Sequence, residues 1–261
     1  MDHLNRAKRV KDNEFYTQYK DVEDELSKYP KSVFINKVIY CPCDSDESAF
    51  VKYFKNHTEL GYKKLIYTCL DDGVDMFSDY ADNLFNECDI VVTNPPFSYE
   101  AKLIDKLYKM NKKFILIGAI TLITNKGIKS KIIENKFNAG FCCNKNCSMN
   151  FMRPDGSIKA VIATWYHNLD DIKITRKQLS QYKTMQDLKD EGIKLYKYDN
   201  YDALECKDFK NCPIDYYGEI GLPISCFNKL DRDLFDVVML TNDLEFNDDR
   251  VFYRIVVKRK I

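Results

Sequence analysis

The segment Ile90-Val91-Val92-Thr93-Asn94-Pro95-Pro96-Phe97 decides the fold prediction. Its first four residues are apolar or β-branched, which is typical of a buried strand, and two prolines then end that strand. The residue before a proline avoids the helical region, so we expect Asn94 to be extended at the strand end. Proline has no backbone N–H, so the Asn94 side-chain oxygen and the Pro95 carbonyl offer two acceptors without a competing donor.

Two converging acceptors of this kind fit an exocyclic amine. An NH2 group on a planar ring can donate one hydrogen bond to each oxygen, which draws its nitrogen toward tetrahedral geometry and localises the lone pair for attack on a methyl group. Phe97 would then offer an aromatic face on which the ring stacks. The structural alternative is an ordinary strand-to-loop turn that contains two prolines.

The rest of the chain predicts a parallel sheet, because apolar runs alternate with segments of helical periodicity. Apolar residues at helical spacing follow the first and third of these runs, at Phe50 to Phe54 and Leu103 to Met110. In such sheets, ligands bind at the carboxyl ends of the strands, near the point where strand order reverses. The predicted strands are Val38 to Cys41, Leu65 to Cys69, Asp89 to Thr93, Phe114 to Gly118 and Ala160 to Trp165.

Asp44 follows the first of these strands and has two interpretations. With Glu47 it forms a capping box for a helix beginning near Ser45, and at that helix N-terminus it would also reach a cofactor. The residues from Cys41 to Asp46 contain no Gly-rich phosphate loop, which argues against a dinucleotide or a nucleoside triphosphate. A methyl donor without phosphates fits better.

The charge balance excludes binding to nucleic acid by bulk attraction, since 40 basic and 40 acidic side chains give a formal net charge of zero. Local patches would have to contact the phosphates. Each basic run is also compatible with a solvated face. The runs are Arg6, Lys8, Arg9 and Lys11; Lys126, Lys129, Lys131 and Lys136; and Lys258, Arg259 and Lys260.

The ten cysteines are expected to be reduced thiols of a cytoplasmic protein. No signal peptide and no apolar run of about 18 residues is apparent, so no membrane association is expected. No metal is predicted, because Cys41 and Cys43 are too close for the usual zinc-ligand pair and the other candidates lack regular spacing. Those candidates are Cys142, Cys143, Cys147, His3, His57 and His167.

Five segments of the chain stand out together. They are Asn13-Glu14-Phe15-Tyr16-Thr17-Gln18, Tyr40-Cys41-Pro42-Cys43-Asp44, the stretch from Asp89 to Ser98, Trp165-Tyr166-His167-Asn168-Leu169 and Gly221-Leu222-Pro223-Ile224-Ser225. In this order they resemble adenine-specific DNA methyltransferases of the EcoRI modification-methylase type, over nearly the whole chain. The proline motif is shared by many amino-methyltransferases, whereas its combination with Glu-Phe-Tyr-Thr-Gln is far more specific.

The resemblance implies a class I methyltransferase fold, an α/β Rossmann-like domain with a mostly parallel sheet and helices on both faces. It implies S-adenosyl-L-methionine as cofactor and transfer to the N6 amine of a flipped-out adenine in a specific sequence of double-stranded DNA. Such an enzyme would act in a restriction-modification pair, with a separately encoded endonuclease, or as a stand-alone enzyme of a mobile element.

By the same resemblance, Asn94, Pro95, Pro96 and Phe97 take the catalytic positions. Phe15, Tyr16 and Thr17 line the cofactor pocket, Asp44 lies near the methionine part of the cofactor, and Asp75 faces its adenine, with Asp71 and Asp72 as competitors for that role. The chain departs from the family at Asn13, where an acid is usual, and at Ala119 and Thr121, where asparagines are expected.

From about Asp170 onward the chain lacks the strong strand–helix alternation of its first part. This change divides it into residues 1–170, the cofactor-binding catalytic domain, and residues 171–261, an α+β extension expected to help recognise DNA. The extension carries mixed charge and many aromatic residues, as in Lys194 to Tyr198 and Phe252 to Val257, and a purely structural role is the alternative. Rival functions are methylation of RNA, of guanine or of a protein glutamine, and a catalytically silent DNA-binding protein on the same fold.

Overall fold

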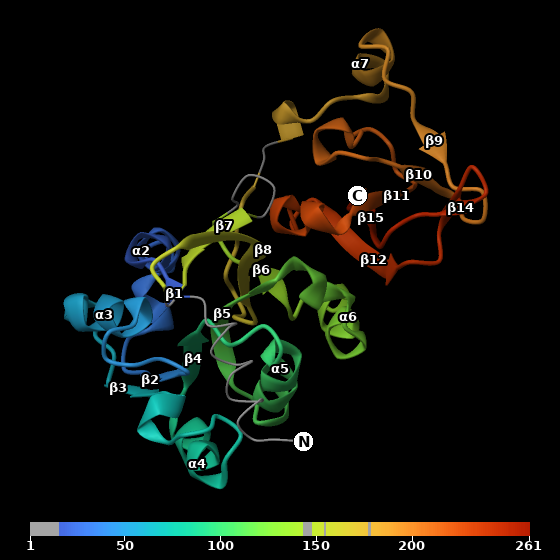
Figure 1. Cartoon of the computed structure of the whole chain (residues 1–261). Coiled ribbons are helices and arrows are strands. Elements are labelled where there is room, and N and C mark those ends of the chain that lie inside the picture. The colour runs from blue at the N-terminus through green and yellow to red at the C-terminus, as the bar shows by residue number, and fades with distance from the viewer. Residues whose placement is uncertain (1–15, 143–147, 154, 177–178) are drawn as a thin grey trace, which may run out of the picture. The chain divides into compact units, whose positions relative to one another are not determined.

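The computed structural model describes residues 16–142, 148–153, 155–176 and 179–261 (Figure 1). Contacts within the chain define two compact units, the first formed by residues up to Ala119 together with Ala139–Asp170, and the second by Ile120–Asn138 and Asp171–Ile261. Phe15 and the N-terminal basic run lie outside the described residues.

The first unit is built on a sheet whose strand order, within the described residues, is β1-β7-β8-β5-β4-β2-β3, with β6 paired to β8. Its helices are α2 (Tyr19–Leu26), α3 (Ala49–Asn56), α4 (Asp79–Glu87) and α5 (Glu100–Lys109). Its strands are β1 (Tyr16–Thr17), β2 (Val38–Pro42), β3 (Lys64–Thr68), β4 (Ile90–Thr93), β5 (Lys113–Ala119), β6 (Asn138–Ala139), β7 (Ser148–Met152) and β8 (Ile158–His167).

The centre of this sheet is covered on both faces. Every residue of β2 and of β4 is buried, and so are the five central residues of β5. Side chains of a strand alternate between the two faces, so consecutive buried positions mean that protein packs on each side. The five predicted strands are thereby confirmed, each to within two residues at either end.

Strand direction changes across the sheet. β3, β2, β4 and β5 are parallel neighbours, whereas β8 runs antiparallel to β5 and β7 antiparallel to β8. The next strand in sequence after β2 is β3, which lies on one side of it, and the strand after that, β4, lies on the other side. Strand order therefore reverses between β2 and β4. This is the class I Rossmann-like α/β fold predicted from the sequence, with the ligand-binding crevice expected at the carboxyl ends of β2 and β4.

The predicted capping box of Asp44 and Glu47 is wrong. α3 begins at Ala49, four residues later than expected, and the Ser48 hydroxyl accepts a hydrogen bond from the Val51 N–H at 3.3 Å. A serine in the extended conformation before the first helical residue satisfies an otherwise unpaired N–H, which is the role the acid was expected to fill. Asp44 therefore lies before the cap, at the end of β2.

A buried carboxylate connects the start of the described chain to the loop after β6. Glu25 of α2 is fully buried, and its two oxygens accept hydrogen bonds from the backbone N–H groups of Phe141 at 2.7 Å and Cys142 at 2.6 Å. The Tyr29 hydroxyl donates to the same carboxylate at 2.9 Å. These bonds compensate the desolvation of the charge.

The second unit contains a separate sheet, in the strand order β12-β15-β11-β10-β9. Its core includes Tyr198, Ala203, Leu244 and Val256. Its helices are α6 (Lys126–Ile133) and α7 (Met185–Asp190), and its strands are β9 (Tyr196–Lys197), β10 (Ala203–Glu205), β11 (Glu219–Pro223), β12 (Phe235–Thr241), β13 (Glu245–Phe246), β14 (Asp249–Arg250) and β15 (Arg254–Arg259).

Residues 120–138 belong by their contacts to the second unit, although the sequence analysis included them in residues 1–170. The guanidinium of Arg232 explains part of this grouping, because it donates to the Ile132 carbonyl at the end of α6 at 2.9 Å. The assignment of catalysis and DNA recognition to the two parts stays a prediction.

The longest helix in the described ranges, α5, has ten residues. No helix of the described residues is therefore long enough to cross a bilayer.

Gly140→Ala should destabilise the first unit. A Cβ at this position would lie 2.2 Å from Glu25 Oε1 and 2.5 Å from the Trp165 Cβ, so the Glu25 hydrogen bonds would have to break or the sheet would have to shift. Overpacking of this kind costs about 1–3 kcal/mol or more. Thermal unfolding measures the loss.

Gly127→Ala is the matched control. This glycine lies inside α6, and a new Cβ would meet only Asn125 Oδ1, at 3.4 Å. Alanine favours helix over glycine by about 1 kcal/mol, so the control should unfold at the same temperature as the wild type or higher. An unchanged midpoint for Gly140→Ala would contradict the packing argument.

Candidate active site

The turn after β4 presents the proline motif at the carboxyl edge of the sheet. Pro95 is buried, whereas Asn94, Pro96 and Phe97 are partly exposed. The Tyr99 N–H donates a hydrogen bond to the Pro96 carbonyl at 2.8 Å. The hydrogen bond that closes the turn therefore uses the Pro96 carbonyl and not the carbonyl of Pro95. The motif therefore lies where the sequence predicted it, between a fully buried strand and the start of α5.

Thr93, the last residue of β4, ties the motif to the end of β2. Its hydroxyl lies 2.8 Å from Asp44 Oδ2 and also contacts the Pro42 carbonyl. The Asp44 N–H in turn donates to the Thr68 carbonyl at the end of β3, at 2.9 Å. These contacts join the carboxyl ends of three neighbouring strands and bring Asp44 next to the residue that precedes Asn94.

Asp44 is a buried acid with 6% of its surface exposed. Burial raises its pKa to about 7, while hydrogen bonds from Thr93 and Ser48 oppose the rise. A carboxylate in this position would gain from a nearby cation. The Asp44 carboxylate at this edge therefore fits a ligand with a positively charged centre and no phosphates.

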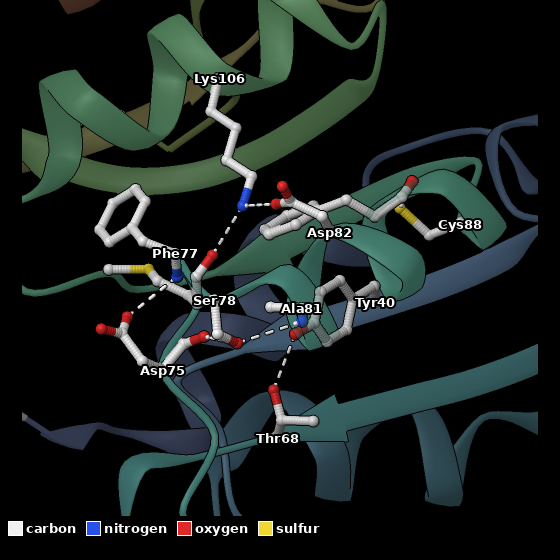
Figure 2. A network of polar contacts seen from close by, with 11 residues as sticks. Tyr40, Thr68, Asp75, Phe77, Ser78, Ala81, Asp82, Cys88 and Lys106 are labelled. Atoms are coloured by element: carbon white, nitrogen blue, oxygen red, sulfur yellow. Dashed lines mark hydrogen bonds and ion pairs between the residues drawn. The ribbon is translucent and has the colours of Figure 1, made fainter.

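The loop after β3 carries the three predicted alternatives for an acid that faces the cofactor adenine. Asp75 is exposed, and its Oδ1 accepts from the Phe77 N–H at 2.9 Å (Figure 2). Asp72 accepts from the Cys69 thiol at 3.0 Å, and Asp71 is exposed on the short 3-10 helix Leu70–Asp72. Cys43 Sγ lies 3.3 Å from Met76 Sδ, so this loop contacts the turn that leads to Asp44.

Ser78 and Lys106 hold that loop in place (Figure 2). The Ser78 hydroxyl donates to the Asp75 carbonyl at 2.7 Å and accepts from the Ala81 N–H at 3.2 Å, which caps α4. Lys106 of α5 donates to the Met76 carbonyl at 2.9 Å and pairs with Asp82 of α4. The position of Asp75 is thus fixed from both sides of its loop.

The N-terminal segment and Phe97 meet at one strand. Thr17 pairs with Phe151 in the β1–β7 ladder, and the Phe97 ring packs edge-on against Phe151 with centroids 6.1 Å apart. Tyr16 is 46% exposed, and the Thr17 hydroxyl oxygen is buried with no hydrogen-bond partner in the described part of the chain. A buried polar atom without a partner at this edge supports a bound group there.

Glu100 is a buried acid that the sequence analysis missed. It begins α5, it is 7% exposed, and its Oε2 accepts from the Ala119 N–H at the end of β5 at 2.9 Å. Burial raises its pKa to about 7, and the bond to Ala119 opposes the rise. This contact is with the backbone of Ala119, one of the two positions where an asparagine was expected.

No part of the described chain gathers three or more histidine, cysteine, aspartate or glutamate side chains in an arrangement that could hold a metal ion. The structure brings Asp44 and the Asn94–Phe97 motif together at the carboxyl edge of the sheet.

A Rossmann-like sheet with an Asn-Pro-Pro-Phe turn at its switch point defines a class I methyltransferase. The model of the family described as adenine-specific methyltransferase EcoRI matches residues 3–83 and 70–260. The chain therefore belongs to this family of adenine-specific methyltransferases, which confirms the resemblance seen in the sequence.

Three curated relatives agree with this assignment. The Type II methyltransferase M.EcoRI of Escherichia coli is 31% identical, over 98% of this chain and 96% of that protein. The Type II methyltransferase M.MgeORF184P of Mycoplasma genitalium is 31% identical, over 91% and 86%. The Type II methyltransferase M.MpnI of Mycoplasma pneumoniae is 30% identical, over 90% and 86%.

Asp44→Asn should raise the melting temperature at pH 8. The folded-state pKa of about 7 lies above the ordinary value of 3.8, so the stability contributed by the protonated form is complete below pH 4 and is lost as the pH rises through 7. An asparagine keeps an acceptor for Thr93 and never ionises. The gain, about 2–4 °C per kcal/mol in a chain of this size, should shrink toward pH 4 in a series of thermal melts.

Asp46→Asn is the control, because the hydrogen bond from Lys55 to this exposed acid lowers its pKa. Removing that charge should leave the melting temperature unchanged or lower it slightly at pH 8. Equal responses of the two variants would contradict the burial argument for Asp44.

Proposed function

We propose that the protein is an S-adenosyl-L-methionine-dependent DNA methyltransferase that modifies the N6 amine of a flipped-out adenine in a specific sequence. The observation that carries the proposal is the bond between Thr93 and Asp44, which couples the amine-acceptor motif to a buried acid at the switch point. Membership of the adenine-specific family supports the choice of base.

Several residues would hold the cofactor. The Asp44 carboxylate fits the cationic methionine part, because a positive charge would offset its burial. Tyr16 and Thr17 would line the pocket together with Phe15, which lies outside the described residues. Asp75, or else Asp71 or Asp72, would accept from the adenine amine of the cofactor. The bound cofactor supplies a methyl group on a sulfonium.

Asn94 and Pro95 would orient the substrate amine. The side-chain oxygen of Asn94 and the Pro95 carbonyl accept one amine hydrogen each, which directs the nitrogen lone pair toward the methyl group. Phe97 stacks on the extruded base, its own ring being braced edge-on by Phe151. No general base is required, since alignment supplies most of the rate gain and the proton can leave to water.

DNA would be the partner of the second unit, in which the predicted recognition segments Lys194 to Tyr198 and Phe252 to Val257 include β9 and the first part of β15. Extruding a base costs a few kcal/mol, and stacking on an aromatic ring offsets that cost. A separately encoded endonuclease and a cytoplasmic location belong to the same proposal.

Asn94→Ala should reduce kcat by about 10²- to 10³-fold, the usual effect of deleting one group that stabilises the transition state. Cofactor affinity, measured by calorimetry, should stay within a factor of two, because the deleted amide contacts the amine. Transfer is measured with labelled cofactor on DNA. Wild-type turnover in this variant would disprove the catalytic role.

Asn83→Ala, an exposed asparagine in the middle of α4, is the matched control and should retain full activity. The same assay with RNA and with protein in place of DNA separates the rival substrates. Sequencing the modified bases of DNA from cells that express the protein gives both the base and its sequence context, and methylguanine or no modification would contradict the proposal.

A further inference from the structure

Phe252 is the most exposed large apolar side chain of the described residues apart from the C-terminal Ile261. It is 69% exposed and lies in the short connection between β14 and β15 of the second unit. Its neighbour Tyr253 is partly buried, and the two rings meet edge-on with centroids 6.3 Å apart. A single exposed aromatic residue is ordinary on a protein surface, but the backbone that carries Phe252 is held by further contacts.

A buried ion pair fixes the backbone that carries this ring. Arg254 Nη1 donates to the Phe252 carbonyl at 2.6 Å, while Nε and Nη2 bind the two oxygens of Glu205 at 3.0 and 2.8 Å. The Glu205 side chain is 2% exposed, and the Tyr198 hydroxyl also contacts it. A bidentate pair inside the sheet is rigid, so Phe252 is displayed on a preorganised tip.

Lys129 of α6 contacts the tip. Lys129 Nζ lies 3.3 Å from the Tyr253 hydroxyl and 4.8 Å from the centre of that ring. Lys126 is exposed and lies three residues earlier, on the same side of the helix. In nucleic acid an apolar base lies next to charged phosphates, so the aromatic ring can contact a base while the lysine contacts a phosphate. A protein partner fits less well, because lysine is depleted from the cores of protein–protein interfaces.

We propose that Phe252 is a wedge residue that packs against an unstacked base step of double-stranded DNA, while Lys126 and Lys129 contact the adjoining phosphates. This inference rests on the proposed function, and the contact would contribute part of the protein's affinity for DNA. Because the tip is fixed before binding, little conformational entropy is lost when the ring packs against the bases.

The test uses the full chain and a fluorescein-labelled duplex that contains the sequence the enzyme methylates. Phe252→Ala should weaken binding by about 5- to 100-fold, the range for losing one base stack, and Phe252→Trp should restore it. The salt dependence of the affinity should not change for either variant. Lys126→Ala with Lys129→Ala should instead lower the log–log salt slope by about 2, one phosphate for each lysine.

Tyr217→Ala is the matched control, because Tyr217 is also exposed, at 53%, and has the Arg259 guanidinium 4.8 Å from its ring. It should bind like the wild type, and all variants should melt at the wild-type temperature. Wild-type affinity of Phe252→Ala, in an enzyme that methylates DNA, would overturn the inference and leave the proposed function intact.

Two further outcomes are decisive. A wild-type protein that methylates no DNA would overturn the proposed function and this inference with it. A change in self-association of Phe252→Ala, measured by sedimentation, with unchanged DNA affinity would assign the ring to contact between two copies of the chain.

Discussion

The Thr93 hydroxyl is the contact on which the candidate site depends. It lies between the Pro42 carbonyl and the Asp44 carboxylate, and it carries a single hydrogen for two acceptors. When Asp44 is ionised, the two acceptors compete for that hydrogen; when Asp44 is protonated, it can donate to Thr93 while Thr93 donates to Pro42. Burial raises the pKa of Asp44 and favours the neutral acid, whereas the hydrogen bonds from Thr93 and Ser48 favour the charged form, as a bound cation would.

Much of the first unit was predictable because its central strands are continuous apolar runs. Residues 38–42, 90–93 and 114–118 are buried on both faces, and burial of that kind leaves an unbroken apolar sequence. The position of the proline motif followed directly, since the carboxyl ends of parallel strands lie at one edge. Asp44 was correctly placed at that edge, but its capping role was wrong because Ser48, a better cap, lies four residues later.

The contacts that complete the site could not be predicted from local pattern. Glu100 is the first residue of an amphipathic helix, where the sequence pattern predicts a solvent-exposed acid. Its carboxylate is instead buried against Ala119, nineteen residues further on. Phe151 contacts Phe97 only because β7 folds back antiparallel to β8. The grouping of residues 120–138 with the second unit likewise depends on tertiary contacts such as the bond from Arg232 to Ile132.

The bonds of α2 have a consequence for biosynthesis. Gln18 bonds to Asn150 across 132 residues, and Phe141 bonds to Glu25 across 116. At a translation rate of about 5–20 residues per second, the ribosome needs roughly 6 to 26 s to make the partners of this first helix. Until then, the Glu25 carboxylate stays in water, and α2 packs only against elements already made, such as α3.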